Sequence, residues 1–280
     1  MRTAVITVAH GRHQHLRRQL DGLAVGSHLP DLHVVVALAD PDVPGIVAGD
    51  ARRHVVAHDA DPAALPLGQA RNVGAAAALE RGAELLVFLD VDCIPGRDLI
   101  GRYLDVAGRP QHGDALLCGP VTYLPPPGPH GYDLSALEVR PHPARPAPGD
   151  GDVLAGTDYT LFWSLSFAAT ARTWQRIGGF CELYRGYGGE DTDFGQCAAE
   201  AEVGLRWVGG ANAFHQHHPV SNPPVQHLDD IVANAAVFHR RWGWWPMGGW
   251  LEAFEARGLI ERDADGRPIR LSAPASAKSS

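Results

Sequence analysis

Residues 87–92 read Val87-Phe88-Leu89-Asp90-Val91-Asp92, an apolar run that ends abruptly in two carboxylates one residue apart. The run predicts a buried strand. An unpaired carboxylate is costly to bury, so such a pair at a strand end usually faces water or a cation. Side chains alternate along a strand, so Asp90 and Asp92 share a face, where one can reach a divalent metal and the other a ribose hydroxyl. Two solvated acids at a strand-to-loop junction are the alternative.

Through the first 120 residues, short β-branched runs alternate with Ala/Leu-rich stretches of helical spacing. This alternation is typical of βαβ units on a mostly parallel sheet, so we expect an α/β, Rossmann-like fold flanked by helices. The expected strands are Ala4–Val8, His33–Leu38, His54–Ala57 and Leu85–Leu89, and the expected helices are Gln14–Leu23 and Gln69–Arg81. Ligands bind such sheets beyond the carboxyl ends of the strands, where Ala9–Arg12 and Asp90–Asp92 both lie.

The second half begins with residues 125–151, whose proline and glycine content excludes a helix or a central strand and predicts a long surface loop. After it we expect strands at Leu161–Phe167 and Leu205–Val208 and helices at Thr170–Ile177, Glu190–Ala201 and Leu228–Trp242. We expect one catalytic domain over residues 1–262, with a nucleotide-binding half at 1–120 and an acceptor and metal half at 152–262. Residues 263–280, rich in charge, Pro and Ser, predict a loose tail.

The composition excludes several classes of protein. The net charge is −8 and only one lysine, Lys278, is present, so no basic face can neutralise nucleic-acid phosphates and we expect no nucleic-acid partner. No apolar stretch approaches the length of a membrane span, which leaves peripheral association as the only membrane role. The first residues run into the Ala4–Val8 strand without a basic leader, and the four cysteines lack a C-x-x-C pair, so we expect a cytoplasmic protein with reduced thiols.

A second acidic cluster, Tyr187-Gly188-Gly189-Glu190-Asp191-Thr192-Asp193, lies at the start of a predicted helix. The glycines let the backbone approach a ligand, and a carboxylate in the first turn is oriented by the helix N-terminus. Ordinary helix capping is the alternative for any one of these acids.

A histidine cluster, His215-Gln216-His217-His218, follows the Leu205–Val208 strand. Imidazole is a common ligand of divalent metals, and His215 and His218 can face one ion from a single turn. With Asp92 as a candidate carboxylate ligand, this cluster favours metal or phosphate contact.

These motifs, taken in chain order, resemble those of the GT-A glycosyltransferases. The likeness is closest to the β-1,4-galactosyltransferases and to the catalytic domain of polypeptide N-acetylgalactosaminyltransferases, with kinship to the broad family 2 enzymes. It covers residues 4–218 and depends on five segments, which are Val8–Leu16, Arg71–Gly74, Asp90–Pro95, Gly178–Phe180 and Gly188–Asp191.

The resemblance implies that Asp92 is a ligand of Mn²⁺ or Mg²⁺, that Asp191 is the catalytic base, and that Glu190 lies against the donor or acceptor sugar. The family's Met-x-x-His metal motif falls on residues 215–218, so His218 matches the ligand histidine and His215 replaces methionine. Which of the three histidines completes the site stays open. The residues implied to contact the donor nucleotide are Ala9, His10, Arg12, Asp40, Arg71, Asn72, Asp90, Val91 and Asp92.

The sequence also departs from the family. The proline at the end of the first strand is Val8 here, an arginine of the same motif is His10, and the aromatic before Gly-Gly-Glu is Tyr187 where the family has Trp. The family's acceptor-site tyrosines are unmatched. Tyr187, Trp163 and Trp245 are the acceptor-side candidates, and the Trp-rich segment Arg241–Trp250 is either an acceptor lip or a hydrophobic clamp on the core.

The expected reaction is metal-dependent transfer of a hexosyl or N-acetylhexosaminyl group from a UDP-sugar to an acceptor hydroxyl, of a glycan or another molecule. Asp191 as general base gives inversion, and a retaining outcome stays open. A metal-dependent phosphohydrolase or nucleotidyltransferase acting on a nucleotide-sugar is the alternative, because it would use the same metal and diphosphate contacts. A non-catalytic sugar-binding module is a third possibility. A nicotinamide dehydrogenase is disfavoured, because Ala9–His13 has only one glycine where that class needs G-x-G-x-x-G.

Overall fold

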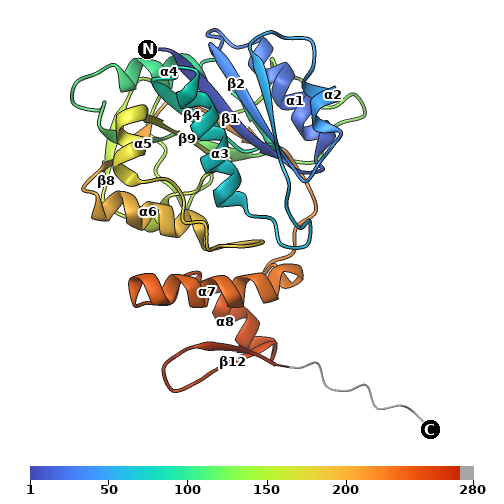
Figure 1. The fold of residues 1–280 in the computed structure, drawn as a ribbon, viewed down its shortest axis with the longest axis vertical. Helices are drawn as coiled ribbons and strands as arrows, with labels where there is room; N and C mark the ends of the chain where they lie inside the picture. Colours follow the sequence, from blue (N-terminus) through green and yellow to red (C-terminus); the bar gives the residue numbers. More distant parts are fainter. Residues whose placement is uncertain (272–280) are drawn as a thin grey trace.

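The computed structural model describes residues 1–271 and has a central sheet between two layers of helices (Figure 1). Eight strands lie in the order β3-β2-β1-β4-β9-β6-β10-β8, with parallel pairing except at β4-β9, β9-β6 and β10-β8. They are β1 (Thr3–Ala9), β2 (Leu32–Leu38), β3 (Arg53–His58), β4 (Leu85–Leu89), β6 (Ala115–Cys118), β8 (Val153–Gly156), β9 (Ser166–Thr170) and β10 (Gly204–Val208). The predicted α/β fold class is confirmed.

Both faces of the sheet are covered. The helices are α1 (His13–Ala24), α2 (Val43–Val47), α3 (Leu67–Glu80), α4 (Leu99–Ala107), α5 (Ala171–Ile177) and α6 (Glu190–Glu200). The core on one face takes side chains from α3, α5 and α6, and the cores on the other take side chains from α1, α2 and α4. In β1, Ile6 belongs to the first core and Val5 to the second, which explains why the strand is apolar on both sides.

A small second sheet, in the order β5-β11-β7, lies beyond the end of β4. Its strands are β5 (Cys93–Pro95), β7 (Val121–Tyr123) and β11 (Ala213–His215). β11 pairs antiparallel with β5, so that His215 lies opposite Cys93. This pairing brings the histidine cluster to the Asp90–Asp92 turn, and it was not anticipated from the sequence.

Most expected elements are confirmed to within a few residues, but the strand expected at Leu161–Phe167 is wrong. A 3₁₀ turn, η1 (Tyr159–Leu161), occupies its start, and β9 begins only at Ser166. The reason is local hydrogen bonding. Asp158 caps η1 by accepting from the Thr160 N–H at 3.0 Å, and the Ser164 N–H donates to the carboxylate of Asp191 at 2.9 Å instead of to a neighbouring strand.

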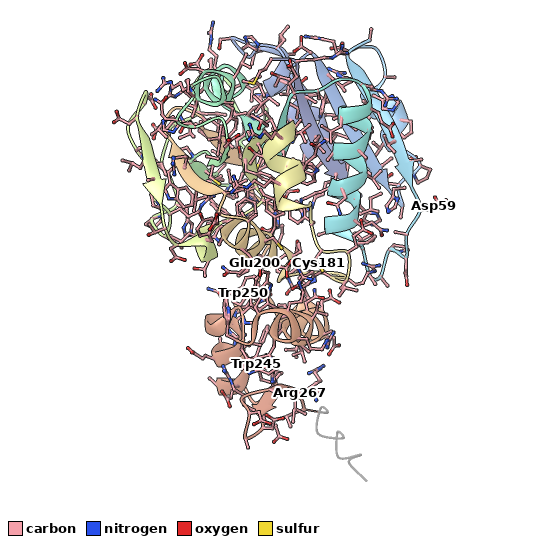
Figure 2. The ribbon with its side chains drawn as sticks, turned by 60° about the vertical axis from the view of Figure 1, so that its left-hand side comes forward. Asp59, Cys181, Glu200, Trp245, Trp250 and Arg267 are labelled. Carbon is pink, nitrogen blue, oxygen red and sulfur yellow. The ribbon has the colours of Figure 1, made fainter. Side chains whose placement is uncertain are left out.

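The C-terminal unit consists of η2 (Val225–His227), α7 (Leu228–Trp242), α8 (Gly248–Ala256), β12 (Ile260–Arg262) and β13 (Pro268–Arg270). It packs around its own apolar cluster below the sheet domain (Figure 1). Figure 2 shows Trp250 on the side of this unit that meets the sheet domain and Trp245 farther from it. The loose tail expected from residue 263 is corrected as far as residue 271, because β12 and β13 pair as a hairpin there. The rest of that expectation, residues 272–280, lies outside the described residues.

The proline-rich segment between β7 and β8 has no helix or ladder strand, as predicted, and forms two isolated bridges, Thr122↔Pro141 and Gly128↔Gly131. Within residues 1–271, no helix combines the length and the apolar character that crossing a bilayer requires.

Candidate active site

Three side chains converge at the end of β4 as a candidate metal centre. The Nε2 atoms of His215 and His218 each lie 3.4 Å from Asp92 Oδ2, and ligand atoms of the three residues lie within 4.8 Å of one another. Asp92 Oδ1 is buried and has no hydrogen-bond partner among residues 1–271. One carboxylate and two imidazoles are a donor set that Mn²⁺ and similar ions accept, so these residues fit a divalent cation.

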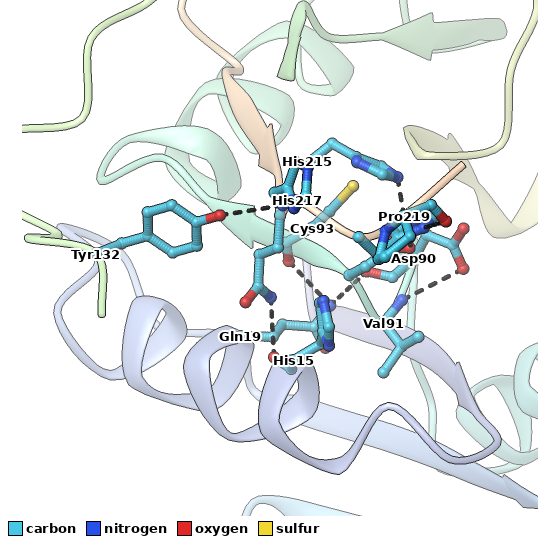
Figure 3. Close-up of polar contacts among 12 residues, drawn as sticks. His15, Gln19, Asp90, Val91, Cys93, Tyr132, His215, His217 and Pro219 are labelled. Atoms are coloured by element: carbon cyan, nitrogen blue, oxygen red, sulfur yellow. Dashed lines mark hydrogen bonds and ion pairs between the residues drawn. The ribbon is translucent and has the colours of Figure 1, made fainter. Parts of the chain in front are cut away.

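The electrostatics of this group match its geometry. Burial raises the pKa of Asp92, but the two imidazoles outweigh burial and hold that pKa well below its ordinary value. Burial lowers the pKa of His215, and the Asp92 carboxylate reverses the shift, so that the pKa is raised. His217, by contrast, has an exposed side chain, and its backbone N–H donates to the Tyr132 hydroxyl at 3.0 Å (Figure 3). His215 and His218, not His217, therefore face Asp92.

Gln19 fixes the turn that carries these carboxylates. Its side chain is fully buried on α1, and its Nε2 donates to the carbonyls of Asp90 at 2.7 Å and Cys93 at 3.1 Å (Figure 3). Its Oε1 accepts from the Thr7 hydroxyl at 2.8 Å. Sequence reasoning missed Gln19, although a glutamine among the apolar positions of an amphipathic helix is a detectable signal.

A cavity of about 600 Å³ opens beside this turn and is lined by Asp90, Arg71, Glu190 and Asp191. Gly188 and Gly189 precede the acids with φ of +92° and +95°, a backbone shape that favours glycine. Asp191 Oδ2 accepts from the Ser164 N–H, whereas its Oδ1 is buried and has no hydrogen-bond partner among the described residues. Asp191 is thus held through one oxygen, while its other oxygen makes no hydrogen bond within residues 1–271.

Glu190 lies beside Arg71, with 3.6 Å between Oε1 and Nη1, and both side chains are about nine-tenths buried. Burial, and then the charge of Asp191, raises the pKa of Glu190 to about 7 against the opposing charge of Arg71. Burial and the charge of Asp92 raise the pKa of Asp90 to about 6. Asp90, Glu190, Asp191 and Arg71 together form what we call the cavity floor. It therefore has three carboxyl groups and one guanidinium, whose single positive charge cannot neutralise all three.

The raised pKa of Glu190 predicts a pH dependence of stability. Between its ordinary value of 4.5 and about 7, the folded protein holds a proton on Glu190 that the unfolded chain has released. The contribution of this group to the free energy of unfolding is therefore largest at low pH and is lost as the pH rises to about 7. The charges that face Glu190 are Asp191, Asp90 and Arg71. In EDTA, we expect the Tm of the wild type to fall between about pH 5 and pH 8 by more than the Tm of Glu190→Gln does. Equal falls in Tm for the two proteins would contradict the raised pKa of Glu190.

The residues expected on the donor side gather at the ends of β1 and β2. Asp40 Oδ2 accepts from the Gly11 N–H and lies 2.8 Å from His13 Nε2, so it ties the two strand ends together. His10 Nδ1 lies 2.8 Å from the Leu38 carbonyl, and Arg12 takes a left-handed backbone with φ of +47°. Ala9 and Val91 are buried and belong to one apolar cluster beneath this edge.

Asn72, also expected to contact the donor, lies on α3 and is engaged with the segment after α5. Its side-chain amide exchanges hydrogen bonds with the backbone of Phe180, at 2.8 and 2.9 Å, and donates to Glu182 at 3.0 Å. Both amide atoms are engaged within the chain, so the residue holds the glycine turn that precedes Phe180.

The three acceptor-side candidates, Trp163, Tyr187 and Trp245, all line the same cavity, together with Trp244 and Trp250. Tyr187 stacks on Trp250 with ring centroids 5.6 Å apart. Trp245 also stacks on His239 at 4.0 Å, and its Nε1 donates to the Asp265 carbonyl. The Trp-rich segment is thus both a wall of the cavity and a clamp within the C-terminal unit.

A family model described as the N-terminal domain of galactosyltransferase matches residues 156–219, the segment that carries Asp191, His215 and His218. The fold is similar to that of S. aureus TarS (residues 1–349), with a TM-score of 0.57 and 14% identity over 84% of this chain and 65% of that chain. The chain therefore has the GT-A fold of these glycosyltransferases. The predicted resemblance to galactosyl- and N-acetylgalactosaminyltransferases is confirmed for the fold and for the segment 156–219.

Two further structures show the same fold with ligands. TarS 1–349 in complex with UDP-GlcNAc has a TM-score of 0.57 and 14% identity, covering 84% of this chain and 66% of that chain. GalNAc-T7 with UDP, GalNAc and Mn²⁺ has a TM-score of 0.56 and 13% identity, covering 77% and 44%. The chain spans less than two thirds of the length of each of these structures. No curated protein matches it in sequence.

Proposed function

We propose that this protein is a glycosyltransferase that moves a hexosyl or N-acetylhexosaminyl group from a UDP-sugar to an acceptor hydroxyl, with inversion and with Mn²⁺ or Mg²⁺ bound. One observation carries the proposal. Three buried atoms around the cavity and the turn beside it, Asp92 Oδ1, Arg71 Nη1 and Asp191 Oδ1, have no hydrogen-bond partner among residues 1–271. A cation, a phosphorylated donor and a hydroxyl are the ligands that these three atom types accept.

Asp92, His215 and His218 would hold the cation. When a cation is bound, its contribution is to neutralise the charge that develops on the leaving diphosphate. The ligands bound in the similar structures, UDP-GlcNAc in TarS and UDP with Mn²⁺ in GalNAc-T7, support this donor class and this metal.

The donor nucleotide would lie along the ends of β1 and β2. Ala9, His10, Arg12, Asp40 and Val91 border this edge, and Asp90 continues it toward the cavity. Arg71 lies on the cavity floor, where its guanidinium can contact the donor. Asn72 is assigned a structural role, because its amide is already engaged with Phe180 and Glu182.

Asp191 would act as the general base. Its free Oδ1 accepts the proton of the acceptor hydroxyl as the new bond from that oxygen to the anomeric carbon forms and the bond to the diphosphate breaks. A single displacement of this kind inverts the anomeric configuration. Glu190, held beside Arg71, would contact the sugar that is transferred.

The acceptor would enter between Trp163, Tyr187 and Trp245. Aromatic faces suit the C–H faces of sugars, which favours a glycan acceptor. With four ionisable side chains on the floor and only Arg71 positive, a neutral sugar fits this wall better than an acidic one.

Identifying the reaction products tests this proposal. The protein is incubated with Mn²⁺ and UDP-GlcNAc, UDP-GalNAc or UDP-Gal, with and without a panel of saccharide acceptors, and the products are identified by NMR. We expect UDP as the leaving group and an inverted anomer in the transferred sugar. A phosphohydrolase or nucleotidyltransferase, which the comparisons do not favour, would instead cleave the diphosphate and give UMP or a sugar phosphate.

A further inference from the structure

The loop that delivers Glu190 and Asp191 has little regular structure of its own. Gly186, Gly188 and Gly189 all have positive φ, at +65°, +92° and +95°. Glycine loses more backbone freedom on ordering than any other residue, so a loop of this shape is costly to hold. On the sheet-domain side, the Gly186 N–H donates to the Leu65 carbonyl at 3.0 Å. The hydrogen bonds that α7 of the C-terminal unit makes to the backbone of residues 185–188 are more numerous.

Asn234 of α7 is the main anchor. It is only 3% exposed, and its Nδ2 donates to the carbonyls of Arg185 and Gly188, both at 2.8 Å, with the Tyr187 carbonyl at 3.3 Å. Its Oδ1 accepts from the Arg185 N–H at 3.3 Å. One buried amide therefore engages both ends of the four-residue stretch before Gly189. A buried amide is retained at low cost only when its hydrogen bonds are made in this way.

Two other residues on the same face of α7 contact the loop and the helix that follows it. Asp230 Oδ2 accepts from the Tyr187 N–H at 3.2 Å, and Arg241 Nε donates to Asp193 Oδ1 at 2.6 Å. Asp230, Asn234 and Arg241 are spaced by four and seven residues, which places them along one stripe of the helix. Asp193 lies in the first turn of α6, two residues after Asp191, and is fully buried. The stripe thus holds the loop before the acids and the helix turn that follows them.

We propose that Asn234 is a positioning residue for catalysis, which sets the place of Glu190 and Asp191 through the backbone of residues 185–188. The C-terminal unit is then part of the catalytic apparatus, because α7 supplies this anchor. The catalytic half of this inference rests on the proposed function, whereas the anchoring half concerns the fold alone.

Asn234→Ala tests both halves. Hydrogen exchange, read by mass spectrometry, is expected to speed up at the amides of residues 185–188 by about tenfold or more and to stay unchanged in β1 and β4. UDP release from UDP-GlcNAc with Mn²⁺ is expected to slow by about tenfold or more in kcat, while the Kd for UDP with Mn²⁺ stays within about twofold. A loss of structure alone would instead lower Tm and the fraction of protein that binds UDP.

Arg240→Ala is the matched control, since Arg240 is exposed on the same helix. Asn234→Asp keeps the acceptor for the Arg185 N–H but loses the donated bonds, so it is expected to behave like Asn234→Ala. If the alanine variant does not fold, Asp230→Ala removes the milder anchor at Tyr187 and is expected to lower kcat by about threefold, again without a change in Kd.

The outcomes separate the two proposals. Unchanged exchange at residues 185–188 in both folded variants overturns the anchoring, and faster exchange with a wild-type kcat overturns the positioning role. If the wild type binds UDP with Mn²⁺ but releases no UDP from UDP-GlcNAc, UDP-GalNAc or UDP-Gal in the presence of the acceptor panel, the proposed function fails, while the exchange result still decides whether α7 anchors the loop.

Discussion

Replacing Asp191 with asparagine is expected to slow UDP release from UDP-GlcNAc by about 10²–10⁴-fold, the range that a positioned general base contributes. Asparagine retains a carbonyl oxygen that can accept from the Ser164 N–H, so the side chain keeps its anchor but can no longer accept a proton. The Kd for UDP with Mn²⁺ is therefore expected to stay within about twofold of the wild type. Steady-state kinetics and calorimetric titration measure the two quantities.

Glu200→Gln is the control for this experiment, because Glu200 is an exposed acid at the far end of the same helix, α6 (Figure 2). It is expected to retain the wild-type rate. A wild-type rate in Asp191→Asn would contradict the assignment of the base and move it to Glu190, the other acid at the start of α6.

Replacing Asp92 with alanine is expected to abolish the Mn²⁺-dependent part of UDP binding. The change removes the only carboxylate of the three-residue metal group and leaves two imidazoles without the anion that faces them at 3.4 Å. Loss of one of three ligands typically costs far more than the about 10–100-fold associated with an outer-shell partner. Titration of UDP with Mn²⁺ and with EDTA measures the effect.

Two controls sharpen this prediction. His217→Ala removes the exposed histidine of the cluster, which lies outside the three-residue metal group, and Glu200→Gln removes an exposed acid at the far end of α6. Both are expected to bind UDP and Mn²⁺ as the wild type does. If His217→Ala abolished metal-dependent binding and Asp92→Ala did not, the ligand assignment would be wrong.

The sequence predicted the first half of the sheet well because each strand there is a short β-branched run bounded by polar residues. Leu85–Leu89 ends at the acidic turn as expected, and α7 has the predicted bounds Leu228–Trp242. Periodicity is a reliable signal in such segments. The strand expected at Leu161–Phe167 is wrong although its side chains are apolar, because these side chains line the core and the cavity while the backbone before Ser166 does not pair as a strand. The Leu161 N–H donates to the Asp158 carbonyl and the Ser164 N–H to the Asp191 carboxylate.

The candidate site residues could be selected by residue type, but the strands and side chains that position them could not be predicted from the sequence. Asp92, His215 and His218 could be grouped by chemistry, yet the three-residue strands β5 and β11 that bring them together are too short to give a periodic signal. Gln19 and Asn234 act through backbone carbonyls of distant segments, which residue patterns do not reveal. The hydrogen bonds of Asn72 with the backbone of Phe180, 108 residues away in the chain, are likewise invisible in residue patterns.

The central claim is that the cavity and its acidic turn bind a nucleoside diphosphate through a divalent cation. A thermal-shift matrix of the wild-type protein with UDP, GDP, TDP and CMP, each with Mn²⁺, Mg²⁺ or EDTA, tests it most directly. A ligand that binds only the folded state adds about 2.7 kcal/mol at a hundredfold excess over Kd. We expect Tm to rise with UDP and Mn²⁺ or Mg²⁺ and to return to its ligand-free value in EDTA; no shift with any nucleotide and metal would contradict the account.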